Sequence, residues 1–273
     1  MDHITSTILK LTGTRMKITV TKNKKEISIE INKPNQKDIV AARSFSGGVF
    51  AKVLKNPDII TRDQLNKYLL DKGLWTDEDQ KNLEKISEEI SKGERQLARG
   101  GKDEKGKKFS KEKAKKLALE MRIKRMEQLI LIAKLKKYDH LTLEGQTDNA
   151  NFDFLVSRCA SLNNKPLFKN YDEYIEDSQE DYAVKIAETL AEMMYGSYED
   201  IEKEQSENKF LVKYEFVNED LKLVNVEGKL IDESGKLVDD EGRYIDDKGN
   251  FIDSNGDSVD EDGNPIEEFT PFE

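Results

Sequence analysis

The chain has 273 residues, of which 37% are charged and 36% hydrophobic. Its one cysteine, Cys159, excludes an intrachain disulfide and a cysteine-rich metal site, and it has only two histidines, His3 and His140. No apolar run approaches 18 residues, and the first ten residues lack the basic start and apolar core of a signal peptide. We therefore expect a protein that stays in the cytoplasm, without a membrane span and without a metal or other cofactor.

The net charge of −10 is concentrated near the C-terminal end. Residues 223–273 carry 16 acidic and 4 basic side chains, a balance of −12. The preceding 222 residues carry 39 acidic and 41 basic side chains, a balance of +2. This separation predicts an acidic tail attached to a nearly neutral body.

The first elements predict an α+β fold that begins with a small β-hairpin unit, residues 1–35. Apolar and polar residues alternate in two short runs, 16–20 and 27–31, that are separated by a polar break. Such period-2 runs are typical of two strands with one buried face. A third strand within residues 4–11 could join them.

A helical segment, residues 36–75, follows. We expect a helix over 37–55 with an interruption near Gly47 and Gly48, and a second helix that begins at Thr61 and stops at Gly73. Trp75, the only tryptophan, is expected to fill a core position beside the start of the next helix.

Residues 76–138 are predicted to form an antiparallel helical hairpin, a short coiled coil. Thr76 and Ser110 are placed to begin its two helices. The first helix is acidic and the second is basic, which would favour their pairing. The expected seam consists of apolar residues at heptad-like spacing in each helix: Leu83, Ile86, Ile90 and Leu97, then Leu119, Ile123, Met126, Ile130 and Ala133.

Residues 139–210 are predicted to be a further helical segment. Thr147 is placed to cap one helix, and Gly196 is placed to end another. Cys159 lies among Val156 and Ala160, so we interpret it as a small core residue rather than a nucleophile.

Residues 211–273 contain a seven-residue repeat, whose clearest units run from Leu223 to Asn264. In each unit two residues, mostly apolar, precede Asp or Asn, and Gly follows three positions later. Asp or Asn starts a turn by bonding its own backbone, and Gly accepts the left-handed conformation after it. We therefore predict an acidic heptapeptide tail of β-turns, a narrow repeat ribbon.

The side chains of this ribbon are candidates for partner binding because they recur at regular spacing. The candidates are Asp232, Asp239, Asp246, Asp253, Asp260, Tyr244 and Phe251. Calcium binding is an alternative for the acidic turns. The spacing departs from that of an EF-hand loop, however, since glycine stands fourth rather than sixth and no helices flank it.

A basic patch precedes the second helix of the hairpin and continues into it. Its members are Lys107, Lys108, Lys111, Lys115 and Lys116. Lysines at this density could neutralise phosphates, but few aromatic residues lie between them, and nucleic acid is not the expected partner. The stretch 101–108 resembles a phosphate-binding loop without the Ser or Thr that would hold magnesium, and it follows a predicted helix rather than a strand.

The sequence contains no motif for an activated nucleophile, for a paired acid and base or for a metal, so we expect a protein that is not an enzyme.

Four stretches of the chain resemble a known family: 64–75, 145–152, 191–196 and the acidic repeat that ends at Phe272. Together they resemble a family of tailed-bacteriophage proteins from structural and morphogenesis modules. The resemblance implies a role in virion assembly, and it brings no catalytic residues with it.

We therefore expect a non-enzymatic assembly factor that acts like a tail assembly chaperone, with phage virion or tail proteins as partners and the host cytoplasm as its location during assembly. A minor structural component of the virion is an alternative, and self-association stays open. A third possibility is an acidic inhibitor that mimics nucleic acid. The sequence names neither the partner nor the oligomeric state.

Overall fold

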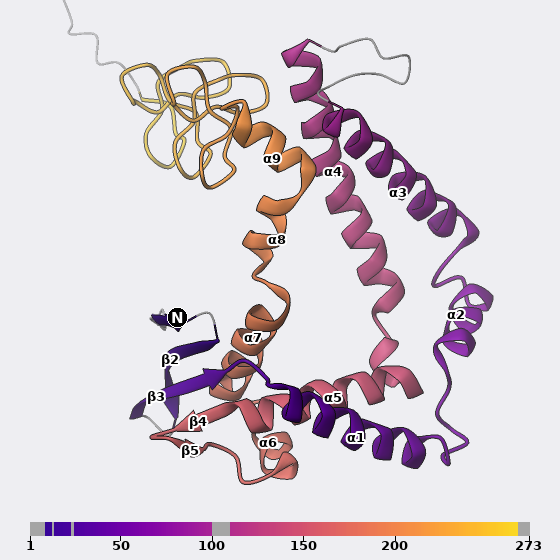
Figure 1. The fold of residues 1–273 in the computed structure, drawn as a ribbon. Helices are drawn as coiled ribbons and strands as arrows, with labels where there is room; N and C mark the ends of the chain where they lie inside the picture. Colours follow the sequence, from indigo (N-terminus) through magenta and orange to yellow (C-terminus); the bar gives the residue numbers. More distant parts are fainter. Residues whose placement is uncertain (1–8, 13, 23–24, 100–109, 267–273) are drawn as a thin grey trace, which may run out of the picture. The chain divides into compact units, whose positions relative to one another are not determined.

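The computed structural model describes residues 9–12, 14–22, 25–99 and 110–266. It combines helices with a small antiparallel sheet, which confirms an α+β fold (Figure 1). The chain divides into two compact units. The first consists of residues 1–86 and 127–201, and the second of residues 87–126 and 202–273.

The sheet belongs to the first unit, and its strands follow chain order. They are β1 (Leu9–Thr12), β2 (Arg15–Lys22), β3 (Lys25–Asn32), β4 (Ala160–Leu162) and β5 (Lys165–Pro166). The predicted hairpin is confirmed, with Ile18 opposite Ile29 in β2 and β3. Part of the expected third strand is β1; residues 4–8 lie outside the described residues. The hairpin does not stand alone, because β3 also pairs with β4.

Helices α5 (Leu143–Cys159) and α7 (Asp181–Tyr195) cover the apolar side of this sheet, and α1 (Gln36–Val53) and α6 (Tyr171–Asp177) pack against α5. Buried residues of the strands, such as Ile18 and Ile31, pack with Leu155, Ile186 and Leu190 of α5 and α7. Helix α1 lies beside α5 (Figure 1). This core removes the hairpin's apolar face from water and so stabilises it.

Two of the predicted helix boundaries in this unit are wrong. Helix α1 continues through Gly47 and Gly48 without interruption, because an Asn35 capping box starts it and helix α5 supports its length. Helix α5 begins at Leu143, where the side chain of Thr142 accepts the N–H of Gly145. Thr147 lies inside that helix and donates its hydroxyl to Leu143 O.

Helix α2 (Arg62–Asp71) and Trp75 form a second, smaller core. Thr61 caps α2 as predicted, and Trp75 is buried with Leu65 and Leu69. The guanidinium of Arg62 donates to both oxygens of Asp139 at 2.6 and 2.7 Å. This bidentate pair fixes the start of α2 to the short 3₁₀ helix η1 (Asp139–Leu141).

Helices α3 (Asp77–Ala98) and α4 (Lys111–Lys136) contact each other in antiparallel register. In the first unit Lys134 binds Asp79, and in the second Lys124 binds Glu89, each pair at 2.6 Å. Ile90 and Leu97 of α3 are buried, as the sequence predicts. The seam predicted for α4 is wrong, because the buried residues of this helix are Ala114, Ala118 and Met121.

The physical reason is the space that Gly93 of α3 leaves for the side chain of Met121. A Cβ added at Gly93 would lie 2.5 Å from Met121 Sδ, so a larger residue there would displace this side chain. The small-residue face of α4 is therefore the one that meets α3, and the predicted heptad residues are rotated to the other side.

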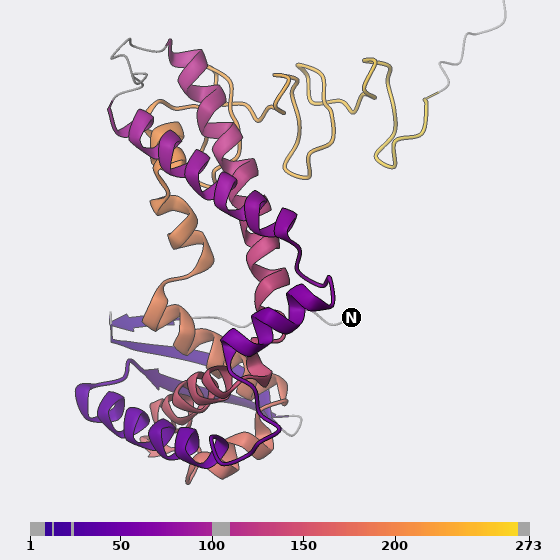
Figure 2. The ribbon, with the colours of Figure 1, turned by 90° about the vertical axis from the view of Figure 1, so that its right-hand side faces the viewer.

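Helix α7 ends at Gly196, which has a φ of 92°, as the sequence predicts. Two short helices follow, α8 (Tyr198–Glu204) and α9 (Ser206–Lys213). Beyond α9 the chain of the second unit runs through successive turns joined by isolated antiparallel bridges, the first between Val217 and Leu223 and the last between Val259 and Pro265. Figure 2 shows these turns following one another along the segment.

The structure groups the segments differently from the five that the sequence predicts, 1–35, 36–75, 76–138, 139–210 and 211–273. The first unit contains segments 1–35 and 36–75 and much of segment 139–210. The second unit contains part of the helical hairpin and the repeat. None of the helices within the described ranges is long and apolar enough to cross a membrane.

Candidate functional site

The predicted aspartates of the repeat all begin turns, and their carboxylates bond to those same turns. Asp253 Oδ1 accepts the backbone N–H groups of Asn255 and Asp257 at 2.8 and 2.9 Å. Asp260 Oδ1 does the same with Asp262 and Asn264 at 3.0 and 2.8 Å. The pattern recurs at Asp239 and Asp246. At Asp232, Oδ1 accepts the N–H of Lys236 and the hydroxyl of Ser234.

These hydrogen bonds favour the charged form of the carboxylates. The backbone N–H of Asp257 lowers the pKa of Asp253, and that of Asn264 lowers the pKa of Asp260. The side-chain amide of Asn250 lowers the pKa of Asp246. The first role of these aspartates is therefore to close their own turns, and no three His, Cys, Asp or Glu side chains in the described part of the chain converge as a metal site.

The two predicted aromatic residues lie between successive turns. Tyr244 donates its hydroxyl to Asp232 Oδ2 at 3.2 Å, and the guanidinium of Arg243 lies 4.4 Å from the centre of the Phe251 ring. Both rings are half-buried. Tyr244 thus bonds to a turn that begins twelve positions earlier, and Phe251 makes a cation–π contact with a residue eight positions earlier.

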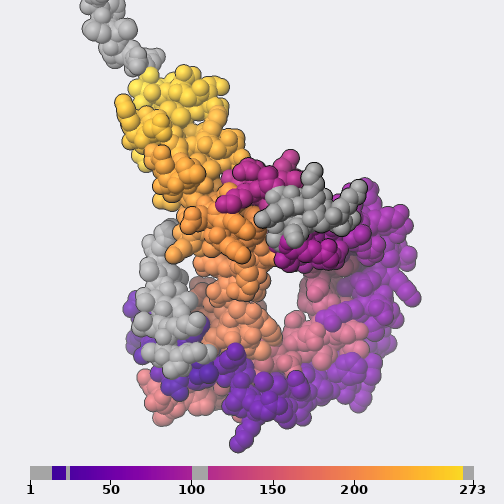
Figure 3. Space-filling view, turned by 45° about the horizontal axis from the view of Figure 1, so that its top comes forward, coloured from indigo at the N-terminus to yellow at the C-terminus, as the bar shows by residue number. Residues whose placement is uncertain are grey.

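Three basic side chains connect turns that are further apart. Lys222 binds Asp240, Lys236 donates to Ser254 O, and Arg243 lies 3.8 Å from Glu261. Each pair is 18 residues apart, since 240 − 222, 254 − 236 and 261 − 243 all equal 18. Figure 3 shows this segment, in gold and yellow, with its side chains at the surface.

The repeat begins one unit earlier than the sequence suggested. Asn218 accepts the N–H groups of Asp220 and Lys222, as the later aspartates do in their turns. Leu221 stands where later units have glycine, and its φ is 60°. The sequence alone does not reveal this unit, because leucine interrupts the glycine pattern.

Part of the predicted basic patch contacts this beginning of the repeat. The amine of Lys111 lies 5.5 Å from the centre of the Tyr214 ring, and that of Lys115 lies 5.2 Å from the centre of the Phe216 ring. Lys116 pairs with Glu120 along α4. Lys107 and Lys108 lie outside the described residues.

A polar cluster that no sequence motif predicts fixes α9 to α4. Arg125 binds Glu207, which is fully buried, and also Glu94 at 2.6 Å. Arg122 donates from Nε to Asn208 Oδ1 at 2.6 Å and from Nη1 to Leu221 O at 3.1 Å. The burial of Glu207 gives little signal in the sequence, because it depends on an arginine 82 positions away.

The outward face of α4 carries the apolar residues that were predicted to meet α3. Ile123, Met126 and Ile130 recur at steps of three and four, and their side chains are 51%, 54% and 61% exposed. Leu129 is also exposed. Since Met121 and Ala118 are buried on the opposite side of the helix, we define Ile123, Met126 and Ile130 as the outer stripe of α4.

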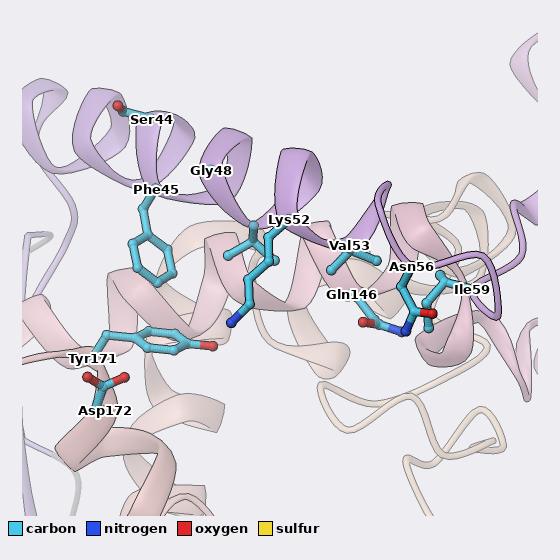
Figure 4. A pocket seen from close by; sticks show the side chains of 11 residues that line it. Ser44, Phe45, Gly48, Lys52, Val53, Asn56, Ile59, Gln146, Tyr171 and Asp172 are labelled. Carbon is cyan, nitrogen blue, oxygen red and sulfur yellow. The ribbon is translucent and has the colours of Figure 1, made fainter.

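A hollow of about 770 Å³ opens in the first unit between α1, α5 and the start of α6 (Figure 4). Phe45 and Tyr171 face each other at 4.5 Å between ring centres, and the amine of Lys52 extends toward Tyr171. Asn56 and Gln146 lie at the other end. Lys52 makes no ion pair with any residue that the structure describes.

A second hollow of about 440 Å³ shares Phe45, Tyr171 and Asp172 with the first. Arg158 and Lys169 also line it. Arg158 pairs with Asp38 at 3.1 Å, and the amine of Lys169 is 3.9 Å from Glu173. The two hollows thus share an aromatic wall and have basic side chains on both sides of it.

Cys159 is buried in the core of the first unit, as the sequence predicts. Burial raises the pKa of its thiol to about 12, so the thiol has the character of a core side chain and not of a nucleophile.

Comparisons with protein-family models, with curated proteins and with solved structures found no match to this chain.

Proposed function

We propose that this protein is a non-enzymatic morphogenesis factor of a tailed bacteriophage that binds a virion or tail subunit during assembly. The observation that supports the proposal best is the outer stripe of α4. Three large apolar side chains at helical spacing are more than half exposed there, and such a row normally packs against another helix. The phage resemblance of the sequence indicates the class of partner.

The occupant we propose is an amphipathic helix of the virion subunit. A row at steps of three and four matches the apolar face of a helix, which would cover Ile123, Met126 and Ile130 together. Exposed charged residues of both signs, Lys116, Glu120 and Glu127, lie on α4 near the stripe. A partner helix that also carries charges of both signs could pair with them.

The acidic repeat would keep such a complex soluble, since a strongly charged surface opposes association. Its aspartates bond to their own turns, so the repeat supplies charge without needing a ligand. We therefore propose the stripe, and not the repeat aspartates, as the first contact with the subunit.

The experiment is affinity purification of a tagged chain from cells infected by the phage that encodes it, followed by mass spectrometry. We expect virion subunits to co-purify with the natural chain and to be lost with the triple variant Ile123→Gln, Met126→Gln, Ile130→Gln. The control is Val40→Gln with Leu54→Gln, because those side chains are 53% and 61% exposed on and beside α1.

The composition of finished particles then separates two roles, since an assembly factor is absent from them and a minor component is present. Recovery of a host nuclease or DNA-binding protein without any virion subunit would overturn the proposal and favour an acidic mimic of nucleic acid. Equal recovery of virion subunits with the stripe variant would show that the stripe is not the contact.

A further inference from the structure

The larger hollow of the first unit, with a volume of about 770 Å³, has the size of a ligand-binding site. It follows one face of α1, where Phe45, Val49 and Lys52 are spaced by four and three residues. Gln146 of α5 and Tyr171 of α6 line it from the other side. All of these residues belong to the first compact unit, so the site needs no contribution from the second.

Two aromatic rings form one end of the hollow. Phe45 contacts Tyr171 at 4.5 Å between ring centres, and it stacks on Phe154 at 4.8 Å. These contacts hold the rings in place, so a ligand that packs on them orders few further side chains. We therefore expect this end of the hollow to accept an aromatic side chain.

Lys52 supplies a positive charge beside the two rings. Its amine lies near the hydroxyl end of Tyr171, whereas the carboxylate of Asp172 lies near the backbone of Tyr171 (Figure 4). Among the described residues, Lys52 forms no ion pair. The amine is thus available to an anion, and it favours a carboxylate close to the aromatic group of a ligand.

Two amide side chains lie at the other end of the hollow (Figure 4). The amide oxygen of Asn56 accepts the N–H of Asp58, and the amide nitrogen of Gln146 donates to Leu141 O. Within the described ranges, this leaves the nitrogen of Asn56 as a donor and the oxygen of Gln146 as an acceptor. A peptide group, with one carbonyl oxygen and one N–H, matches that pair. Asn56 follows Lys52 by about one helical turn, so one ligand residue can reach both.

An aromatic ring, a carboxylate and a peptide group occur on the same residue at the end of a chain. We propose that the larger hollow binds the C-terminal end of a partner protein whose last residue is aromatic. The ring packs on the aromatic wall, the terminal carboxylate pairs with Lys52, and the last peptide group bonds Asn56 and Gln146. Val53 and Ile59 also line the hollow, and they would contact an apolar residue that precedes the last one. Capture of a terminal carboxylate is a general mode of peptide recognition. The site is separate from the outer stripe of α4 and does not depend on the proposed phage function.

The test is an NMR titration of the isotope-labelled full chain with the peptide acetyl-Leu-Leu-Phe. We expect shifts of the backbone signals of Gly48 and Lys52 and of the side-chain amides of Asn56 and Gln146, with a Kd of about 1 mM or below. The same peptide with an amidated C-terminus should bind about fivefold more weakly, because it lacks the carboxylate. The absence of these shifts, or equal affinity for both peptides, would overturn the proposal.

A smaller probe distinguishes a chain end from a free aromatic acid. N-acetylphenylalanine has the ring, the carboxylate and one amide, but it lacks the two leucines. We expect it to bind at least about threefold more weakly than the tripeptide, because contacts with Val53 and Ile59 are lost. Equal affinity would exclude a chain end as the occupant and favour a small aromatic acid.

Two adjacent glycines offer a matched pair of variants. Gly48→Leu places a side chain in the hollow, whereas Gly47→Leu adds the same side chain one residue earlier, where there is also free space but no contact with the hollow. We expect Gly48→Leu to weaken binding of the tripeptide about tenfold and Gly47→Leu to leave it unchanged. The same spectra show whether each variant is folded. Equal affinities of the two variants would contradict binding in this hollow.

A charge variant tests the site without filling it. Lys52→Gln should weaken binding of the tripeptide about fivefold, while Lys55→Gln, at an exposed lysine that does not line the hollow, should not. The amidated peptide should bind equally to the natural chain and to Lys52→Gln, because it has no carboxylate to lose. Binding of the tripeptide that is indifferent to Lys52→Gln would exclude the pairing of this amine with the terminal carboxylate.

Discussion

Arg122 Nη1 donates a hydrogen bond to the backbone oxygen of Leu221, 3.1 Å away. Leu221 has a φ of 60°, in the region that later turns of the repeat fill with glycine. An L-residue in this conformation is less stable by about 1–2 kcal/mol, so the first turn needs support from outside. Helix α4 provides that support, because Nε of the same arginine also binds Asn208 in α9.

Arg122→Gln should therefore loosen the start of the repeat. A hydrogen bond from a charged group contributes about 1.5–3 kcal/mol, and we expect a loss of amide-exchange protection of at least tenfold at Lys222 and Val224. Hydrogen exchange read by mass spectrometry measures this. The control is Lys116→Gln, an exposed position on the same helix. Unchanged protection would show that the repeat folds without α4.

Glu207→Gln should destabilise the second unit strongly. The Glu207 side chain is fully buried against Arg125, and removal of its charge leaves Arg125 with only the more exposed carboxylate of Glu94. Breaking such a pair typically costs about 3–5 kcal/mol, measurable as a lower urea midpoint. Glu204→Gln, which removes the exposed partner of Lys209, should change stability by less than about 1 kcal/mol.

Gly145→Ala should destabilise the first unit. An added Cβ would lie 1.9 Å from the backbone oxygen of Asp139, and a backbone atom cannot move aside as a flexible side chain can. We expect a loss of about 3 kcal/mol in the free energy of unfolding. Gly47→Ala in the exposed face of α1 should instead stabilise by about 0.5–1 kcal/mol, since alanine favours a helix. Equal effects would contradict the packing around α5.

Acid should unfold the repeat before the helical parts of the chain. The turn-starting aspartates have lowered pKa values in the folded state, because their own turns donate hydrogen bonds to them. A group of this kind adds stability above its unfolded pKa of about 3.9 and loses it as the pH falls through the lower folded value. Amide protection of residues 217–266 should thus be constant from pH 8 to about pH 5 and decline below about pH 4. Amide protection of the repeat that rises as the pH falls would contradict the expected loss of stability.

The thiol of Cys159 should react slowly with a disulfide reagent in the native protein. Its pKa of about 12 lowers the thiolate fraction at pH 8 on the order of a thousandfold relative to an unfolded cysteine. Absorbance at pH 8 with and without denaturant gives the ratio of rates. A native rate within tenfold of the unfolded rate would show that the core of the first unit opens readily.

Local patterns predicted local structure well. The alternation around Ile18 and Ile29 predicted the hairpin, and Thr61 and Gly196 marked where helices begin and end. Such signals depend on a residue and its close neighbours in the chain, so one sequence is enough to read them. The Asp-to-Gly spacing predicted the turns of the repeat for the same reason.

The predictions that failed depend on distant residues. Heptad spacing could not tell which face of α4 meets α3, because Gly93 decides this by admitting Met121. The continuity of α1 through two glycines depends on α5, more than 90 positions away.

The sequence by itself determined the α+β composition, the caps, the turn repeat and the separation of charge, because each arises from interactions within a few residues. The tertiary structure decided which apolar row of α4 faces outward, which arginine supports Leu221 and where the hollow beside Lys52 opens. Those features depend on contacts between segments far apart in the chain, and packing and burial, rather than local preference, select among them.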